Sequence, residues 1–300
     1  MPTVSEIEVE ADFEELSDKK PWSQVASEMI RDQPLGAAGG AIVVLMILMA
    51  FFAEFLTFFD PEINSLEHML VPPDDVFWLG TDQFGRDQFT RIIFGARTAL
   101  TVGFTCAIIG STLGLVLGVA SAYFGGMFDL VVQRIVDVIM AFPLIILALA
   151  VVATLGPGTE NVIIAITIPF VPQCARVVRS NALAIREIPY VDAARALGFS
   201  NMRIIMRHMA PNVMAPYLIM LTSFLGQAIL LEASLSYLGM GVQEPTPAWG
   251  LMLQGGAEEF AESAPWVAIW PGVAISLSVF GFNLFGDSVR DTLDPKLRKR

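Results

Sequence analysis

Six stretches of the chain are apolar enough and long enough to cross a membrane as helices. A membrane-spanning helix needs about 20 mainly apolar residues, and polar or turn-forming segments separate such stretches in this sequence. They lie at roughly 37–59, 97–122, 130–153, 160–178, 213–238 and 266–288. The pattern predicts an all-α integral membrane protein with six transmembrane helices.

The connections between these stretches differ in length and in polarity. YFGGMFD and TLGPGTE have the composition of tight turns, whereas longer polar loops occupy residues 60–96, 179–212 and 239–264. From this division we expect four regions, which are an acidic N-terminal tail, a first transmembrane helix with an outer loop, a main transmembrane domain and a basic C-terminal tail. Their boundaries are 1–36, 37–96, 97–288 and 289–300.

Arginine and lysine residues are distributed unevenly among the loops. Residues 179–212 hold five arginines and two acids, and the C-terminal tail holds five Lys and Arg residues. Residues 239–264 hold four acids and no Lys or Arg, and residues 60–96 hold seven acids and two arginines. Because cytoplasmic loops carry an excess of Lys and Arg, we expect both termini and residues 179–212 to face the cytoplasm.

The composition agrees with a membrane protein of one main domain. Of the 300 residues, 54% are hydrophobic and 16% are charged, whereas soluble domains are about 45–50% apolar and about 25% charged. Within the second stretch, Gly110, Gly114 and Gly118 recur every four residues, which predicts a smooth helix face for close packing. Arg134 and Asp137 are one turn apart, which predicts a local ion pair.

The sequence lacks the usual signatures of catalysis. It contains no G-x-x-x-x-G-K-[ST] loop to hold the phosphates of ATP, and its two histidines, His68 and His208, are far apart in polar segments. Cys106 and Cys174 lie inside apolar stretches without metal-ligand spacing. We therefore expect a protein that is not an enzyme and that binds no metal or cofactor, so that another subunit supplies energy for any uphill transport.

The loop at 179–212 is too long for a simple turn, and its sequence predicts two short helices. VDAARALG is rich in helix-forming residues and ends at Gly198. SNMRIIMRHM begins at Ser200, a good capping residue, and is predicted to stop before Pro211. The first helix would present a small, shallow face, and the second would carry two arginines one turn apart. These residues are Ala193, Ala194 and Leu197 in the first helix and Arg203 and Arg207 in the second.

The same loop resembles the cytoplasmic loop of ABC import permeases. In that pattern Glu-Ala-Ala is followed after three residues by Gly, and a Pro stands thirteen residues after the Gly. Here Asp192, Ala193 and Ala194 are followed by Gly198 and Pro211 at that spacing, with Asp in place of Glu. RHMAPN resembles the RHxxPN form of the peptide-transporter branch, although a His and an Ala stand where the general pattern has aliphatic residues.

Three further stretches resemble the same branch. They are LGTDQFGRDQFTRIIFGARTAL at 79–100, EASLSYLGMGVQEPTPAWGLML at 232–253 and GDSVRDTLDPKLR at 286–298. The resemblance runs from about residue 25 to the end and identifies the chain as similar to the C-type permease subunits of dipeptide and oligopeptide ABC importers.

The resemblance implies a type I ABC importer permease fold in the cell membrane, surrounded by lipid. It also implies a second, B-type permease, two ATPase subunits that hold ATP and magnesium, and an extracytoplasmic substrate-binding protein, with no nucleic-acid partner. The loop would couple the permease to an ATPase through Asp192, Ala193, Ala194, Leu197, Gly198, Arg203, Arg207 and Pro211. The residues that line the translocation pathway cannot be named from the sequence.

Three alternatives remain open at this stage. Related permeases serve nickel chelates and some sugars, so the cargo is not decided by these motifs. A secondary transporter would need ion-coupling residues at the midplane or internal repeats, which the sequence does not display. A scaffold that only anchors a complex would not need the helical segment at 191–211 for transport.

Overall fold

The computed structural model of the protein describes residues 33–293, and within this range the chain is almost entirely helical. The predicted acidic tail therefore lies mostly outside the described residues, as does the end of the basic tail. The helices are α3 (Pro34–Phe51), α4 (Ala53–Leu56), α5 (Gln88–Phe124), α6 (Gly126–Met140), α7 (Leu144–Leu155), α8 (Thr159–Arg186), α9 (Pro189–Ala196), α10 (Asn201–Ile204), α11 (Met214–Tyr237), α12 (Trp249–Glu259) and α13 (Trp266–Leu293).

Five helices in the described range are long and apolar enough to cross a membrane, and there are six if α6 and α7 count as one bent span. The predicted third span at 130–153 is therefore not one straight helix. The two helices meet at an angle of 90°, and Pro143 stands at the start of α7 with extended backbone angles, φ −56° and ψ 133°. Proline has no N–H to donate and disfavours helical geometry in the residue before it, which explains the break.

The long helix α5 packs closely against α8. A Cβ atom added at Gly110 would lie 2.7 Å from Cβ of Phe170, and one added at Gly114 would lie 2.5 Å from Cβ of Cys174. At Gly118 the nearest atom would be the carbonyl oxygen of Ala175, at 2.7 Å. The prediction of a smooth packing face is confirmed, because any side chain at these positions would push α5 away from α8.

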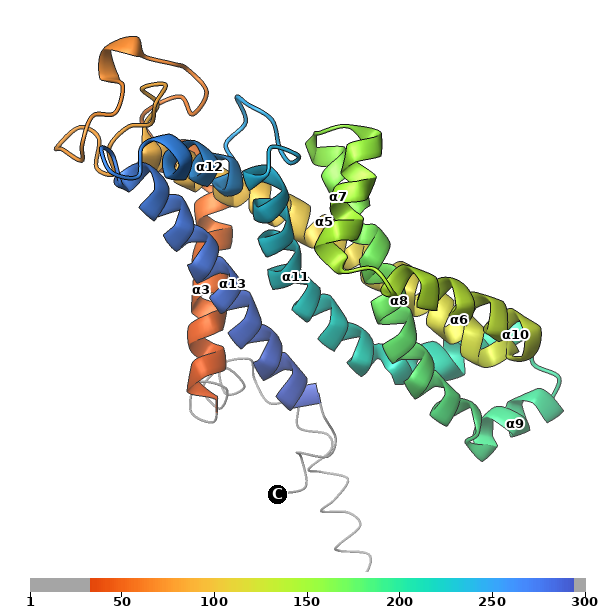
Figure 1. The fold of residues 1–300 in the computed structure, drawn as a ribbon. Helices are drawn as coiled ribbons and strands as arrows, with labels where there is room; N and C mark the ends of the chain where they lie inside the picture. Colours follow the sequence, from red (N-terminus) through yellow and green to blue (C-terminus); the bar gives the residue numbers. More distant parts are fainter. Residues whose placement is uncertain (1–32, 294–300) are drawn as a thin grey trace, which may run out of the picture.

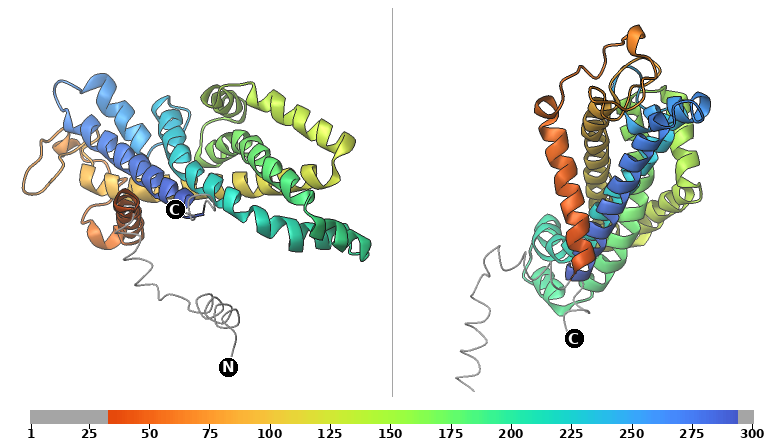
Figure 2. Two further views of the ribbon diagram at one scale, coloured as in Figure 1. Left: turned by 90° about the horizontal axis from the view of Figure 1, so that it is seen from below. Right: turned by 90° about the vertical axis from the view of Figure 1, so that its left-hand side faces the viewer.

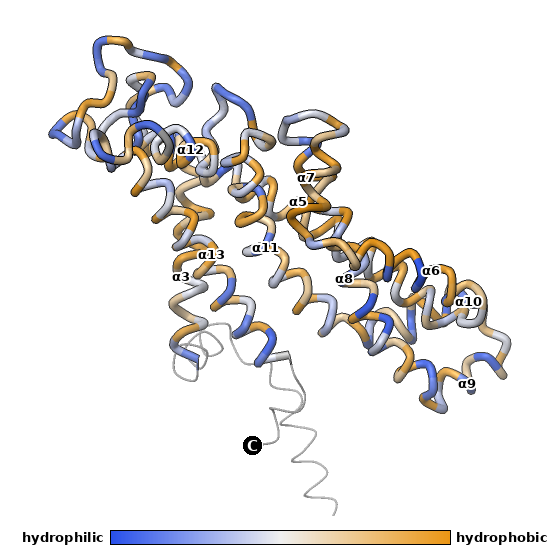
Figure 3. Tube along the Cα trace, viewed as in Figure 1, coloured by the Kyte–Doolittle hydropathy of each residue, from blue (hydrophilic) through white to orange (hydrophobic). Residues whose placement is uncertain are grey.

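The elements gather at two ends of the molecule. Figure 1 shows α9 and α10 at one end, which we call the α9 end, and α12 with the long α4–α5 loop at the other, the α12 end. Helices α3 and α13 pack against each other, and the right-hand view of Figure 2 shows them approaching each other toward their lower ends. In Figure 3 apolar residues dominate the helices between the two ends, while polar residues concentrate in the α4–α5 loop and around α9. This distribution is typical of a bundle that spans a membrane.

Candidate functional site

The predicted coupling loop begins where α8 ends. Helix α9 starts at Pro189, two residues before the predicted VDAARALG segment, and ends at Ala196. Gly198 then adopts φ +76°, a left-handed conformation that glycine adopts without strain. The Ser200 side chain accepts a hydrogen bond from the backbone N–H of Arg203 (3.4 Å) and caps the next helix. The predicted first helix, its glycine stop and the serine cap are confirmed.

The second predicted helix does not stop before Pro211. The chain stays helical from Asn201 to Tyr237, because a π-helical turn at Ile205–Met209 and a 3₁₀ turn at Ala210–Val213 join α10 to α11. In the wider π turn the N–H of Ala210 donates to the carbonyl of Ile205, five residues back. This changed register accommodates Pro211, which cannot donate a backbone hydrogen bond.

The exposed face of α9 differs from the predicted one at a single residue. Asp192, Ala193 and Leu197 are exposed, and Leu197 has 74% of its surface accessible. Ala194 is instead buried, with 4% of its surface accessible. It lies on the same inward face as Val191, since residues three apart on a helix share a side, so the prediction that Ala194 belongs to the outer face is wrong.

The charged residues of the loop are exposed but locally engaged. The Arg195 guanidinium donates to Asp192 Oδ1 (3.1 Å) and lies over the ring of Tyr123, 5.2 Å from its centre. Arg203 lies over the ring of Phe199 at 4.2 Å. Arg207 and Pro211 are exposed as well. These contacts place the guanidinium groups of Arg195 and Arg203 over aromatic rings, while both residues remain exposed.

Hydrogen bonds hold the loop together and join it to the end of α5. The hydroxyl of Tyr123, on α5, donates to Asn201 Oδ1 (2.8 Å), and that of Tyr190 donates to the carbonyl of His208 (3.0 Å). The Asn212 amide donates to the same carbonyl (2.6 Å). The sequence motifs gave no role to these tyrosines and asparagines. The partner of Tyr123 is 78 residues away and that of Tyr190 is 18 residues away, whereas Asn212 bonds within its own turn. The loop is thus a fixed projection of the bundle.

A second polar cluster lies at the α12 end. The Arg86 guanidinium donates to Asp82 (2.7 Å) and to Glu244 (2.5 Å), 158 residues later in the chain. Arg91 is completely buried and lies 3.7 Å from Asp82 and 3.6 Å from Glu244. Burial alone would lower the pKa of Arg86, but the hydrogen bond to Glu244 and the charge of Asp82 hold that pKa above its ordinary value.

This cluster ties the α4–α5 loop to the loop before α12. The indole N–H of Trp249 donates to the carbonyl of Ile92 (2.9 Å), and that of Trp266 donates to the carbonyl of Thr81 (3.1 Å). Trp249 and Phe77 are buried, whereas Trp78 is 59% exposed. Among Phe77, Trp78 and Trp249, only the Trp78 side chain is therefore exposed on the surface. Within residues 33–293 no group of three or more His, Cys, Asp or Glu side chains is placed to hold a metal ion.

Comparison with known protein families identifies the family of this chain. Residues 110–299 match the model of the binding-protein-dependent transport system inner membrane components. The chain belongs to this family. A second model, the N-terminal TM domain of oligopeptide transport permease C, matches residues 20–73 of this binding-protein-dependent permease. Together the two matches confirm the resemblance to C-type permeases and a multi-pass location in a membrane.

Individual relatives cover nearly the whole permease. It is 44% identical over 282 residues to the dipeptide transport system permease protein DppC of Alkalihalophilus pseudofirmus, which covers 93% of this chain and 91% of that one. It is 39% identical over 283 residues to the glutathione transport system permease protein GsiD of Pectobacterium atrosepticum, covering 94% and 93% of the two chains.

Among solved structures, the inward-facing MetNI methionine ABC transporter has a similar fold. The TM-score is 0.56 at 20% identity, and the match covers 69% of this permease and 97% of that chain. The expected fold of an ABC importer permease is thereby confirmed.

Proposed function

We propose that this permease is a subunit of an ATP-driven importer of dipeptides or oligopeptides. It forms the translocation pathway together with a B-type permease, receives cargo from an extracytoplasmic substrate-binding protein and is driven by two separate ATPase subunits. The observation that carries the proposal is the pinned, protruding loop of α9, Gly198 and α10. The peptide cargo is supported by relatives that are named as dipeptide, peptide and glutathione transport permeases.

The loop is proposed to dock into a cleft on an ATPase subunit. Asp192, Ala193 and Leu197 offer an exposed contact face, and Gly198 lets the chain turn sharply behind it. Arg203 and Arg207 add positive charge beside this face. In this arrangement ATP and magnesium are bound by the ATPase subunits, and the permease contributes no catalytic group and no cofactor site of its own.

The orientation follows from the same loop. The first residues of α3, the last residues of α13 and the α9 loop lie toward one end of the molecule (Figure 1), so we propose that both termini and the α9 end face the cytoplasm. The excess of Lys and Arg in residues 179–212 supports this orientation. The α4–α5 loop and α12 then face outward.

Cysteine labelling tests the orientation. Cys106 and Cys174 are buried and are replaced by alanine, after which Leu197→Cys and Glu67→Cys each introduce one exposed thiol. We expect a membrane-impermeant maleimide to label position 67 in intact cells and position 197 only after permeabilisation. Labelling of position 197 in intact cells would overturn the proposed orientation.

Reconstitution tests the function. The permease is assembled in vesicles with its B-type partner and both ATPases, and the binding protein is added outside. We expect uptake of a radiolabelled dipeptide that requires ATP and the binding protein. A nickel chelate and an oligosaccharide are offered in parallel, and uptake of either one in place of the peptide would contradict the proposed cargo. Uptake driven by an ion gradient without the ATPases would instead show a secondary transporter.

A further inference from the structure

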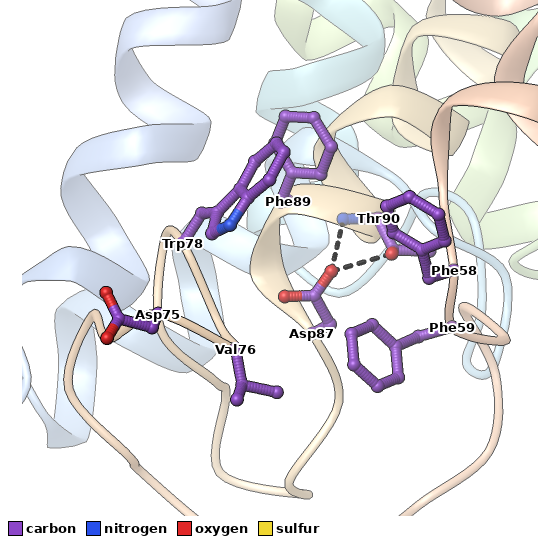
Figure 4. Close-up of a pocket in the computed structure, with 8 residues that line it drawn as sticks. All are labelled: Phe58, Phe59, Asp75, Val76, Trp78, Asp87, Phe89 and Thr90. Atoms are coloured by element: carbon purple, nitrogen blue, oxygen red, sulfur yellow. Dashed lines mark hydrogen bonds between the residues drawn. The ribbon is translucent and has the colours of Figure 1, made fainter.

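The α4–α5 loop contains an aromatic pocket that the coupling mechanism does not use. Its cavity measures about 340 Å³. The walls come from two parts of the loop, Phe58 and Phe59 just after α4 and Trp78 and Phe89 before and at the start of α5 (Figure 4). The rings of Trp78 and Phe89 lie 5.1 Å apart at an angle of 59°. Phe58, Trp78 and Phe59 are 86%, 59% and 39% exposed, so three of these aromatic side chains are open to solvent.

A carboxylate lies in this pocket with only one oxygen engaged. Asp87 caps α5, and its Oδ2 accepts hydrogen bonds from the backbone N–H (2.9 Å) and the hydroxyl (2.6 Å) of Thr90. The residue is 5% exposed, and its Oδ1 has no hydrogen-bond partner within the described part of the chain. Figure 4 shows this oxygen pointing away from Thr90, toward the side of the pocket where Val76 and Trp78 lie. A buried acceptor without a donor is destabilising, so this atom is suited to a donor from outside the chain.

The two loops at the α12 end expose charges of one sign only among their described residues. In residues 57–96 and 239–265 the two basic side chains, Arg86 and Arg91, are buried within the polar cluster. The exposed charged side chains described in these two segments are all acids, namely Asp60, Glu62, Glu67, Asp74, Asp75, Glu244, Glu259 and Glu262. Because complementary charges steer association and like charges oppose it, this surface attracts a cationic partner.

We propose that the aromatic pocket receives a lysine or arginine side chain of the substrate-binding protein. This inference rests on the proposed function. Aromatic faces attract cations, and carboxylates such as Asp75 and Asp87 form charge-assisted hydrogen bonds with them. The occupant is assigned to a protein because the acidic surface extends over two loops well beyond the pocket. The α4–α5 loop also projects past the ends of the helices (Figure 1), where a large external partner meets the permease first.

Two variants separate the charge of the pocket from its aromatic walls. Asp87→Asn removes the charge and keeps an oxygen that can cap α5, since Asn and Asp are equally good capping residues. Trp78→Ala removes one wall, and Trp78→Phe restores an aromatic ring. The complete importer is held in lipid nanodiscs, and the dissociation constant of its own binding protein is measured over a range of salt concentrations. We expect Asp87→Asn and Trp78→Ala each to weaken binding about tenfold, with Trp78→Phe close to wild type.

The salt series and a matched control identify the cause. Asp87→Asn is expected to make binding less sensitive to salt, because one attractive charge is lost. Glu67→Gln removes one exposed acid from the same loop outside the pocket, and binding should weaken no more than about twofold. Elution volume and melting temperature show whether each complex remains assembled. A charge-removal scan of Lys and Arg residues on the binding protein should then reveal one residue whose loss has no further effect in Asp87→Asn.

The outcomes distinguish this inference from the proposed function. If wild-type importer binds the binding protein and the Asp87 and Trp78 variants bind it equally well, the pocket assignment is wrong while the importer assignment stands. If the variants change the KM for peptide but not the affinity for the binding protein, the pocket takes a cation of the cargo and the proposal is also overturned. If the wild-type complex does not bind the binding protein at all, the proposed function itself fails.

Discussion

Gly198→Val is expected to abolish transport while the chain still reaches the membrane. Gly198 has φ +76°, where a β-branched residue is strained by roughly 1–2 kcal/mol. Apart from Gly198 and its two neighbours, no atom within residues 33–293 lies within 4 Å of the position that a Cβ would take. The substitution therefore strains one turn and sends a side chain outward from the loop, into the space where we propose that an ATPase subunit docks.

The measurement combines subunit stoichiometry with transport. We expect the purified Gly198→Val complex to lose ATPase subunits, or to hydrolyse ATP without moving peptide. Gly198→Asn is the matched control for backbone geometry, because asparagine adopts positive φ more readily than other side chains do. If Gly198→Asn transports peptide and Gly198→Val does not, backbone strain is the main defect. If both variants fail, the main defect is the side chain that points outward from the loop. Full uptake at a normal ratio of peptide to ATP in Gly198→Val would refute the coupling assignment.

Burial of Ala194 changes which alanine is informative in α9. A tryptophan at position 194 would have to enter the interior of the loop, so a defect there would report misfolding. Ala193 is exposed on the same helix. Ala193→Trp is consequently the variant that obstructs a partner without disturbing the packing of the chain, and it should reproduce the loss of transport.

Arg91→Met is expected to cause the largest loss of stability. Arg91 is 0% exposed and donates to the backbone carbonyls of Pro61 (2.7 Å) and Pro245 (3.2 Å). Its removal leaves Asp82 and Glu244 with one cation, Arg86, and unpairs two carbonyls. Breaking a buried ion pair by removing one partner costs about 3–5 kcal/mol. We expect a lower midpoint of thermal unfolding in detergent and less assembled complex.

Arg97→Met provides the comparison for Arg91→Met. Arg97 also lies on α5 and pairs with Glu54 at 3.3 Å, but the two side chains are 43% and 70% exposed. Exposed pairs of this kind contribute about 0–1 kcal/mol, so the unfolding midpoint should move little. An equal shift in the two variants would show that the buried cluster is not what stabilises the α12 end.

The sequence predicted the elements well where the signal was local. Apolar stretches located the spans, and Gly198 and Ser200 marked the ends of two helices through backbone conformation and capping. The prolines of the apolar stretches differ in their effect. Pro169 and Pro172 remain inside α8, whereas Pro143 marks a 90° bend, because neighbouring turns decide whether a helix can absorb a missing hydrogen bond.

Contacts between distant segments were the ones missed. The predicted ion pair between Arg134 and Asp137 is wrong, since Asp137 pairs with Arg176 on α8 instead. Arg91 and Glu244 are 153 residues apart in the sequence. The periodicity of apolar residues cannot predict that these two side chains meet. The burial of Ala194 likewise depends on which side of α9 packs against the bundle, and helix propensity does not determine that side.

The helix that begins in the coupling loop runs from Asn201 to Tyr237 without a break, over 37 residues, and such a rod is about 55 Å long. The π-helical turn at Ile205–Met209 keeps this helix continuous through the coupling loop. A tilt of ~5° about its centre would carry each tip through ~2 Å, as the length of the rod dictates. A force applied at Asn201 therefore produces a stroke at Tyr237 without any relay of side chains between them.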